Sequence, residues 1–460
     1  MKNSILWQTY LSLSPLEQKH FGQWLQSPFF CRKKALNDLL EVLKQCRQDK
    51  TAPEQEALIR QLKLADITAL RLLMSELLEQ LEQFLIYGER AEMAAADKVL
   101  LAAAYRKRGL DKHFQRTLRE GRRQLDNGPY RHSEYYETLA ALEYEHYQFQ
   151  SSGQRTESFN LQALLDATDL AFLTRKLRQA CFILTHQTMY KTEYRTGMLE
   201  NVLNHVEENP ELLELPAIAL YYYCYLFLKA PENEKPFELF KTRLLEEATV
   251  LPSDMQRDLH LLAINYCVKK INRQQNAYYR EALDLYRSAL RADLLLENGC
   301  LSPFAYNNIV AIALKVGEGA WAETFVETYA ARLENKFRTA NHQLNLARVA
   351  YARKDYGGAL LHLQEADYKD LINNLIAKTL VLKIYYETNE FDALDAHLQS
   401  MQSFLRRQKV IGYHLDNFRN IIRLTRKLMQ ARRGEIPALR DLIEQTTPLS
   451  EKEWLLEMIS

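Results

Sequence analysis

The stretch that decides the fold is residues 346–366, which read LARVAYARKDYGGALLHLQEA. Small residues recur at helical spacing on both sides of a turn at Asp355. The side chains of Ala347, Ala350 and Ala359 would let two antiparallel helices approach closely, while Tyr356 fills the space at their turn. Residues 380–401 repeat this hairpin pattern with Leu380, Ile384, Phe391, Leu394, Leu398 and Met401.

An aromatic residue opens the expected second helix of a hairpin again and again along the chain. These residues are Phe114, Phe159, Tyr194, Phe237, Tyr279, Trp321, Tyr356 and Phe391, at intervals of 45, 35, 43, 42, 42, 35 and 35 residues. Stacked helix pairs give a period of about 34 to 47 residues, because a helix, a turn and a returning helix need that length of chain. The spacing predicts an all-α fold, a right-handed α-solenoid of about eight helix hairpins.

The turn Asp355-Tyr356-Gly357-Gly358-Ala359 resembles the tetratricopeptide repeat, in which Tyr and a small residue follow the turn. The second-helix pattern also matches at Tyr279, Ala282, Tyr286 and Ala289. The resemblance covers about residues 255–405, although the family's Trp, Leu-Gly and terminal Pro positions are mostly absent. The chain thus resembles a degenerate tetratricopeptide-like protein. Residues 13–30 and 173–181 also resemble uncharacterised bacterial helical-repeat proteins, which implies no activity.

The chain outside the repeats predicts a distinct cap at each end. Residues 1–90 lack the repeat, and Ser14, Pro15 and Glu17 form a capping-box pattern at a helix start. We predict an N-terminal helical bundle over residues 1–90, the solenoid over 91–432, and capping helices over 433–460, the last of them around Trp454. Terminal units of a solenoid need a polar outer face, so a capping role explains why both ends differ.

Composition and charge exclude several classes of protein. Only 14 Gly and 12 Pro occur in 460 residues, which disfavours a sheet with many hairpins. With 60 basic and 59 acidic residues the net charge is +1, so a wholesale polyanion binder is not indicated. The longest uncharged apolar run, residues 215–228, is shorter than the ~20 residues that span a bilayer. No secretory signal is visible, so we expect a cytoplasmic protein without a membrane partner.

Six cysteines occur without a C-x-x-C pair, which disfavours a disulfide framework or a zinc knuckle. Cys181, Cys224 and Cys267 fall 43 residues apart, and we interpret them as one repeated core position. Equivalent positions of stacked repeats are expected to lie about 10 Å or more apart, too far for a shared metal.

Known catalytic motifs do not occur in the sequence. Gly317-Glu318-Gly319 lacks the third glycine of a dinucleotide fingerprint, and neither a Walker A lysine nor an H-E-x-x-H zinc motif is present. The histidines are not spaced as chelating pairs on one helix. We therefore expect a protein that is not an enzyme and that uses no cofactor or metal.

Three sets of residues are candidates for binding a partner. Two are arginine rows at helical spacing, which suit phosphates or an acidic protein segment, and the third is a group of tyrosines that supplies rigid contact area. The sets are Arg116, Arg119 and Arg123; Arg419, Arg423 and Arg426; and Tyr136, Tyr144 and Tyr147. The alternatives are solvated helix exteriors for the arginines and packing roles for the tyrosines.

The function that these features favour is a non-enzymatic scaffold or adaptor that binds a protein or peptide in the groove of an α-solenoid. The alternative is a nucleic-acid-associated regulatory protein that binds through its arginine rows. Glu76, Glu79 and Glu82 in the N-terminal segment oppose a phosphate backbone, so that alternative depends on the rows alone. The sequence leaves the oligomeric state open.

Overall fold

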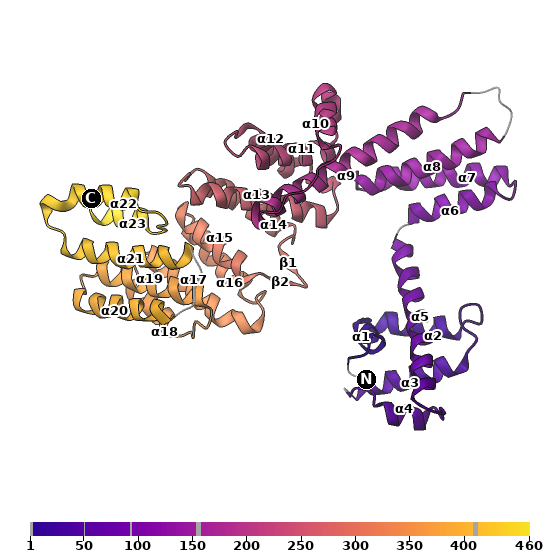
Figure 1. The fold of residues 1–460 in the computed structure, drawn as a ribbon, viewed down its shortest axis with the longest axis horizontal. Coiled ribbons are helices and arrows are strands. Elements are labelled where there is room, and N and C mark those ends of the chain that lie inside the picture. Colours follow the sequence, from indigo (N-terminus) through magenta and orange to yellow (C-terminus); the bar gives the residue numbers. More distant parts are fainter. Residues whose placement is uncertain (1–2, 50, 93, 153–157, 408–412) are drawn as a thin grey trace. The chain divides into compact units, whose positions relative to one another are not determined.

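The computed structural model describes residues 3–49, 51–92, 94–152, 158–407 and 413–460. Most described residues are helical (Figure 1), and the only strands among them, β1 (Leu296–Glu297) and β2 (Cys300–Leu301), form a short antiparallel pair. The predicted all-α class is therefore confirmed. The chain divides into two compact units, residues 1–175 and 176–460, with the boundary inside one long helix.

The first unit begins with five helices that share one apolar core. They are α1 (Ile5–Ser12), α2 (Pro15–Gln26), α3 (Lys34–Gln48), α4 (Gln55–Gln61) and α5 (Ile67–Glu92). The predicted capping box is present at α2: Ser14 Oγ accepts from the backbone N–H of Glu17 at 3.3 Å, and Glu17 Oε2 accepts from that of Ser14 at 2.6 Å. Tyr10, Phe21 and Leu39 are fully buried in this core, so residues 1–90 have an apolar centre of their own.

The rest of the first unit packs around a second, smaller core. Helices α6 (Ala94–Arg106), α7 (Asp111–Asn127) and α8 (Ser133–Ser151) contact one another pairwise. Phe114, Leu118 and Leu142 are buried between them, and the Phe114 ring stacks on Phe149 at 4.4 Å between centroids. Phe114 thus lies near the start of a returning helix, as the sequence predicts.

The predicted repeat is wrong at two of its eight aromatic positions. Phe159 precedes α9 (Leu161–Tyr190), and Tyr194 lies in a non-helical connection, so neither opens the second helix of a hairpin. The reason is that α9 continues for 30 residues without a turn, and its sequence contains neither Gly nor Pro. One continuous helix therefore replaces the expected helix-turn-helix between residues 161 and 190.

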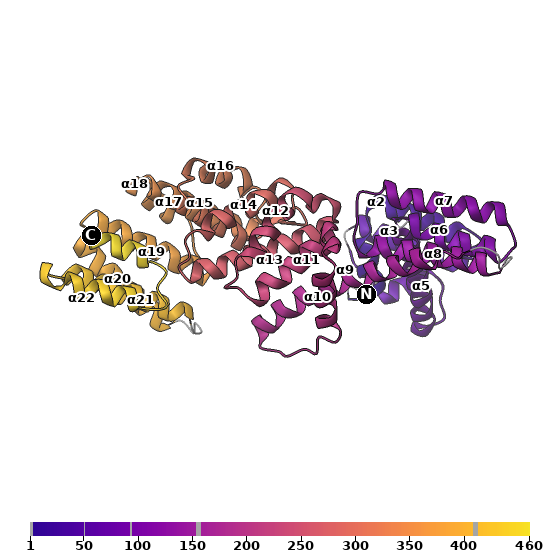
Figure 2. The ribbon, with the colours of Figure 1, turned by 90° about the horizontal axis from the view of Figure 1, so that it is seen from above.

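The second unit continues as consecutive helices that pair with their neighbours (Figure 2). After α10 (Leu199–Glu208) the pairs are α11 (Pro216–Lys229) with α12 (Lys235–Glu247), α13 (Ser253–Asn272) with α14 (Tyr278–Arg291), α15 (Pro303–Lys315) with α16 (Gly319–Ala330), α17 (Asn335–Ala352) with α18 (Tyr356–Gln364), and α19 (Leu371–Glu387) with α20 (Phe391–Arg407). Alternate helices also touch, since α11 contacts α13, and α17 contacts both α15 and α19. Short 3₁₀ turns cover Pro210–Glu214, Ala248–Val250 and Arg433–Glu435.

The aromatic openers of this unit lie where the spacing predicts them. Phe237, Tyr279 and Trp321 are among the first three residues of α12, α14 and α16, and Tyr356 and Phe391 are the first residues of α18 and α20. Their environments differ, because Phe237 is buried whereas Phe391 is 43% exposed. These aromatic residues therefore have similar positions at the helix starts but differ in how they are packed.

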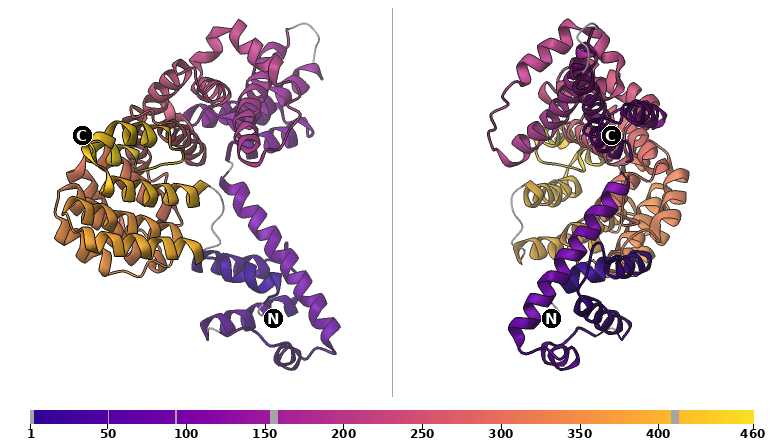
Figure 3. Two further views of the ribbon diagram at one scale, coloured as in Figure 1. Left: turned by 60° about the vertical axis from the view of Figure 1, so that its left-hand side comes forward. Right: turned by 90° about the vertical axis from the view of Figure 1, so that its right-hand side faces the viewer.

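The chain ends with α21 (Tyr413–Gln430), α22 (Ile436–Gln445) and α23 (Lys452–Met458), at the yellow end of the ribbon in Figure 3. These helices share one core with α19 and α20. Trp454 and Leu455 of α23 are buried in that core. Residues 433–460 therefore pack as part of the last hairpins.

The three evenly spaced cysteines are buried as predicted, but two of them are closer than expected. Cys181 Sγ lies 3.3 Å from the carbonyl oxygen of Tyr221, and the thiols of Cys181 and Cys224 contact each other. Burial, with the Cys181 thiol beside it, raises the pKa of Cys224 well above its ordinary value. The short separation arises because α9 meets α11 locally at these residues.

The hydropathy of the helices agrees with the sequence analysis. Helix α11, which holds the longest uncharged apolar run, is buried along most of its length. Within the described ranges, no helix has both the length and the apolarity required to cross a bilayer.

The first turn of α18 contains two glycines, Gly357 and Gly358, and the structure gives a reason for glycine at position 358. Asp355 caps α18 by accepting a hydrogen bond from the backbone N–H of Gly358 at 2.9 Å, and a Cβ on Gly358 would overlap the Asp355 carboxylate. We expect Gly358→Ala to displace this cap and to lower the free energy of unfolding by about 0.5–2 kcal/mol. Urea unfolding followed by circular dichroism measures the change.

Gly357→Ala is the matched control, because a Cβ there would lie 4.0 Å from the nearest Asp355 oxygen. Alanine favours a helix over glycine by about 1 kcal/mol, so this variant is expected to be as stable as the parent or more so. Equal destabilisation by both substitutions would contradict the capping role of Asp355.

Candidate functional site

The strongest candidate site is a cavity of about 510 Å³ in the second unit. Helices α15, α17, α19 and α21 contribute its walls, together with residues 450–451 just before α23. The apolar wall consists of Ala311, Leu314, Ile372, Ile376, Leu380 and Phe418. A volume of this size with a mostly apolar lining and a few polar groups is typical of a small-molecule site.

Three cations and one carboxylate line this cavity. Lys383 Nζ lies 2.9 Å from Glu451 Oε2, and Lys315 Nζ lies 2.5 Å from Glu453 Oε2 at the edge. Burial raises the pKa of Glu451, but the attraction of Lys383, Lys315 and Arg348 outweighs it, so the pKa of Glu451 is lowered overall. Among the described residues, Arg348 has no ion pair, and burial lowers the pKa of its guanidinium to about 10.

A network of asparagines holds Arg348 in place. Asn341, Asn345 and Arg348 lie on one face of α17, at positions i, i+4 and i+7. Arg348 Nη1 donates to Asn345 Oδ1 at 3.0 Å and to the carbonyl oxygen of Asn307 at 3.2 Å. Asn341 Oδ1 accepts from the amides of Asn307 at 2.8 Å and Asn373 at 3.0 Å, which links α15, α17 and α19. The network therefore fixes the guanidinium relative to three helices.

The C-terminal stretch forms a fixed wall of the cavity. Ser450 exchanges two hydrogen bonds with Asn417, of 2.6 and 3.1 Å, and Trp454 Nε1 donates to Glu387 Oε1 at 2.8 Å. Leu449, Trp454, Leu455 and Ile459 are all buried. Releasing this stretch would expose four large apolar side chains, at about 1.5–3 kcal/mol each. The wall is therefore a structural part of the unit.

The first predicted arginine row lies on α7 and is exposed along its length. Arg116 Nε pairs with Glu120 at 2.8 Å, and Lys98 together with Arg116 lowers the pKa of Glu120 to about 2. Within the described part of the chain, Arg119 and Arg123 have no ion pair. The structure places the three on one exposed face of α7, and one of the three charges is already compensated.

The basic residues beside that row are used inside the first unit. Arg106 pairs with Glu145 at 2.8 Å, and Arg122 pairs with Glu143 at 2.7 Å. These bridges join α6 and α7 to α8. Two of the eight basic residues in 105–123 therefore contribute to packing, which the sequence did not reveal.

The second predicted row lies on α21, on a different side from the cavity residues Asn417 and Phe418. Arg419 has a long contact of 3.5 Å with Asp416, while Arg423 and Arg426 donate to the neutral side chains of Asn420 and Gln402. Arg406 and Arg407 are exposed at the end of the neighbouring α20. Each row therefore has two arginines without an ion pair among the described residues, but the single ion pair of the α21 row is longer than that of the α7 row, at 3.5 Å against 2.8 Å.

The structure does not bring the three predicted tyrosines to one surface. Tyr136 is buried, with its ring 5.0 Å from that of Tyr135. Tyr144 is 50% exposed, and Tyr147 packs edge-on against Phe159 at 5.7 Å. Tyr144 is therefore the most accessible of the three, and Tyr136 and Tyr147 have packing roles.

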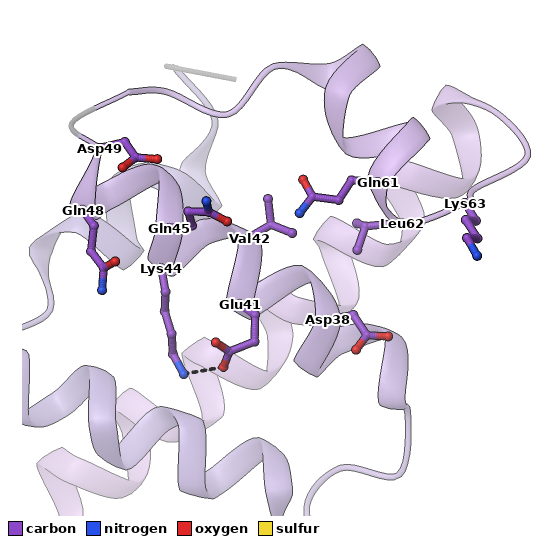
Figure 4. A pocket seen from close by; sticks show the side chains of 10 residues that line it. All are labelled: Asp38, Glu41, Val42, Lys44, Gln45, Gln48, Asp49, Gln61, Leu62 and Lys63. Carbon is purple, nitrogen blue, oxygen red and sulfur yellow. Dashed lines mark hydrogen bonds and ion pairs between the residues drawn. The ribbon is translucent and has the colours of Figure 1, made fainter.

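A larger cavity, of about 730 Å³, lies between α3 and α4 in the first unit (Figure 4). Its lining carries Asp38, Glu41 and Asp49 against Lys44 and Lys63, and Glu41 pairs with Lys44 at 2.6 Å. The mixed charges and amide side chains single out no class of ligand.

Sequence reasoning missed the residues that build the cavity. A signal was present, because Asn307, Asn341 and Asn373 are separated by 34 and 32 residues, close to the shorter repeat interval. A polar residue that recurs with the period of an apolar pattern indicates a buried hydrogen-bonded position. No comparable periodic pattern in the sequence marks Arg348, since its role depends on which helices surround it.

Comparison with known proteins identifies no relative of this chain: no family model matches it, and no curated protein or solved structure matches it either.

Proposed function

We propose that the chain is a non-enzymatic protein-binding scaffold, built as a right-handed α-solenoid of degenerate tetratricopeptide-like hairpins with an N-terminal helical cap. The paired helices from α11 to α20 support this architecture, as do the contacts between alternate helices. The proposal includes a cytoplasmic location, which agrees with the reduced, buried thiols of Cys181, Cys224 and Cys267.

The observation that carries the proposed function is the arginine row on α21. Arg419, Arg423 and Arg426 have one distant carboxylate contact between them in the described chain, and Arg406 and Arg407 add positive charge nearby. An acidic segment of a partner protein would supply the missing carboxylates, and arginine suits them because its guanidinium binds a carboxylate in a bidentate fashion. Nucleic acid is the competing partner for such a row.

A comparison of two charge-reversal variants tests the proposal. Partners are collected with the tagged chain at low and moderate salt and identified by mass spectrometry, and bound nucleic acid is read from absorbance at 260 and 280 nm. We expect R419E/R423E/R426E to lose a defined protein partner at least tenfold, which is about 1.4 kcal/mol. The row on α7 is the matched control, and R116E/R119E/R123E is expected to retain that partner.

Circular dichroism and thermal unfolding of both variants establish that the fold is intact. Loss of salt-sensitive nucleic acid from the α21 variant, without loss of a protein, would support the regulatory alternative. Retention of every partner by that variant would contradict a role for this row.

A further inference from the structure

We propose that the cavity between α15, α17, α19 and α21 binds a small monocarboxylate that carries an apolar body. This inference does not require the scaffold function, because the arginine row and the cavity lie on different sides of α21. It rests on the charge of the cavity, on the free edge of one guanidinium and on the apolar wall.

The charge of the cavity calls for one negative group. Lys315 and Lys383 already have the carboxylates of Glu453 and Glu451, at 2.5 and 2.9 Å. Arg348 is the remaining cation of the lining: Glu451 attracts it electrostatically but is paired with Lys383, and no carboxylate among the described residues forms an ion pair with Arg348. Glu451 is held by its ion pair with Lys383, and the hydrogen bonds of Ser450 with Asn417 hold that part of the chain. With Lys315, Arg348 and Lys383 against Glu451 and Glu453, the cavity and its edge keep one net positive charge, which a single anionic ligand would balance.

The hydrogen bonds of Arg348 leave one edge of its guanidinium available. Arg348 donates two hydrogen bonds to the described residues, and both come from Nη1, to Asn345 Oδ1 and to the carbonyl oxygen of Asn307. Among the described residues neither Nε nor Nη2 makes a hydrogen bond, and neither is a fully buried unsatisfied atom, so both are accessible to a ligand. These two donors form the fork that matches the two oxygens of a carboxylate. A carboxylate thus fits the free edge better than a spherical anion does.

The rest of the cavity suits a hydrocarbon group. Ile372, Ile376 and Leu380 follow one face of α19, and Phe418 and Leu314 approach from α21 and α15. At about 510 Å³ the cavity is large enough for a short aliphatic chain or one ring beside the carboxylate. The apolar wall supplies affinity, and Arg348 supplies the preference for an acid over a neutral analogue.

Isothermal titration of the full chain with octanoate and with 1-octanol tests this inference. The two probes share an eight-carbon chain and differ in charge. We expect saturable one-to-one binding of octanoate and at least tenfold weaker binding of 1-octanol. Arg348→Gln is expected to weaken octanoate binding at least tenfold and to remove the preference over the alcohol, whereas Arg348→Lys retains part of that preference because it keeps the charge without the fork.

A second variant keeps the inference testable if Arg348→Gln perturbs folding. Ala311→Phe places a ring in the cavity wall away from the asparagine network, and it is expected to reduce binding of both probes. Equal affinities for octanoate and octanol in the parent chain would overturn the inference. It would also be overturned by no saturable binding of octanoate up to millimolar concentration, or by octanoate binding that both folded variants retain in full.

Discussion

Replacing Trp454 with alanine is expected to lower the free energy of unfolding of the second unit by about 3–5 kcal/mol. The indole is 5% exposed, packs edge-on against Tyr386 at 5.6 Å between ring centroids, and donates a hydrogen bond to Glu387. Its removal leaves a cavity in the core shared by α19 to α23, and it leaves Glu387 with one donor fewer. Urea unfolding by circular dichroism measures the loss, and hydrogen exchange with mass spectrometry locates it in residues 371–460.

Trp321→Ala is the matched control for that experiment. Trp321 is only half-buried, at the start of α16, where its ring stacks on Phe325 and lies 4.4 Å from the Arg287 guanidinium. The same chemical change at that site is expected to have a clearly smaller effect, since less apolar area is lost. A Trp454 variant no less stable than the Trp321 variant would mean that the C-terminal stretch is not a structural wall. The cavity beside it would then not be preformed.

The periodicity of apolar and aromatic residues was sufficient to predict the fold class and most helix starts of the second unit. It was sufficient because each hairpin buries the same kind of face, so that Phe237, Tyr279, Trp321 and Tyr356 recur at similar places. It failed at Phe159 and Tyr194, where spacing alone could not distinguish a hairpin from the single long α9. The absence of Gly and Pro from residues 161–190 was the local signal for a continuous helix.

The candidate sites show which information a single sequence lacks. Helical spacing could place Arg116, Arg119 and Arg123 on a common face, because that is a property of one helix. It could not predict that Arg122 is paired with Glu143, because that pairing depends on how two helices pack. The cavity has the same origin, since its residues come from four helices and the C-terminal stretch. A single sequence does not show how distant helices pack, and this packing decides which charges are paired and which residues surround a cavity.

Replacing Asn341 with leucine is expected to lower the free energy of unfolding by about 2–4 kcal/mol. Asn341 is 2% exposed, its Oδ1 accepts from Asn307 and Asn373, and its Nδ2 donates to the carbonyl oxygen of Phe337 at 2.7 Å. Leucine has nearly the same shape but makes none of these bonds, so buried donors and an acceptor lose partners at about 1–3 kcal/mol each. The measurement is again urea unfolding of the full chain, with hydrogen exchange to assign the change to α15, α17 and α19.

The control on the same helix is Asn335→Leu, at the exposed first residue of α17, which is expected to change stability by no more than about 0.5 kcal/mol. A triple variant with leucine at Asn307, Asn341 and Asn373 tests whether the loss of stability comes from buried polar groups left without partners. If unsatisfied polar groups cause the loss, removing the amides together should cost less than the sum of the single substitutions, because fewer groups are then left without partners. Strict additivity, or an Asn341 variant as stable as the parent, would show that the asparagines do not act as one network across the three helices.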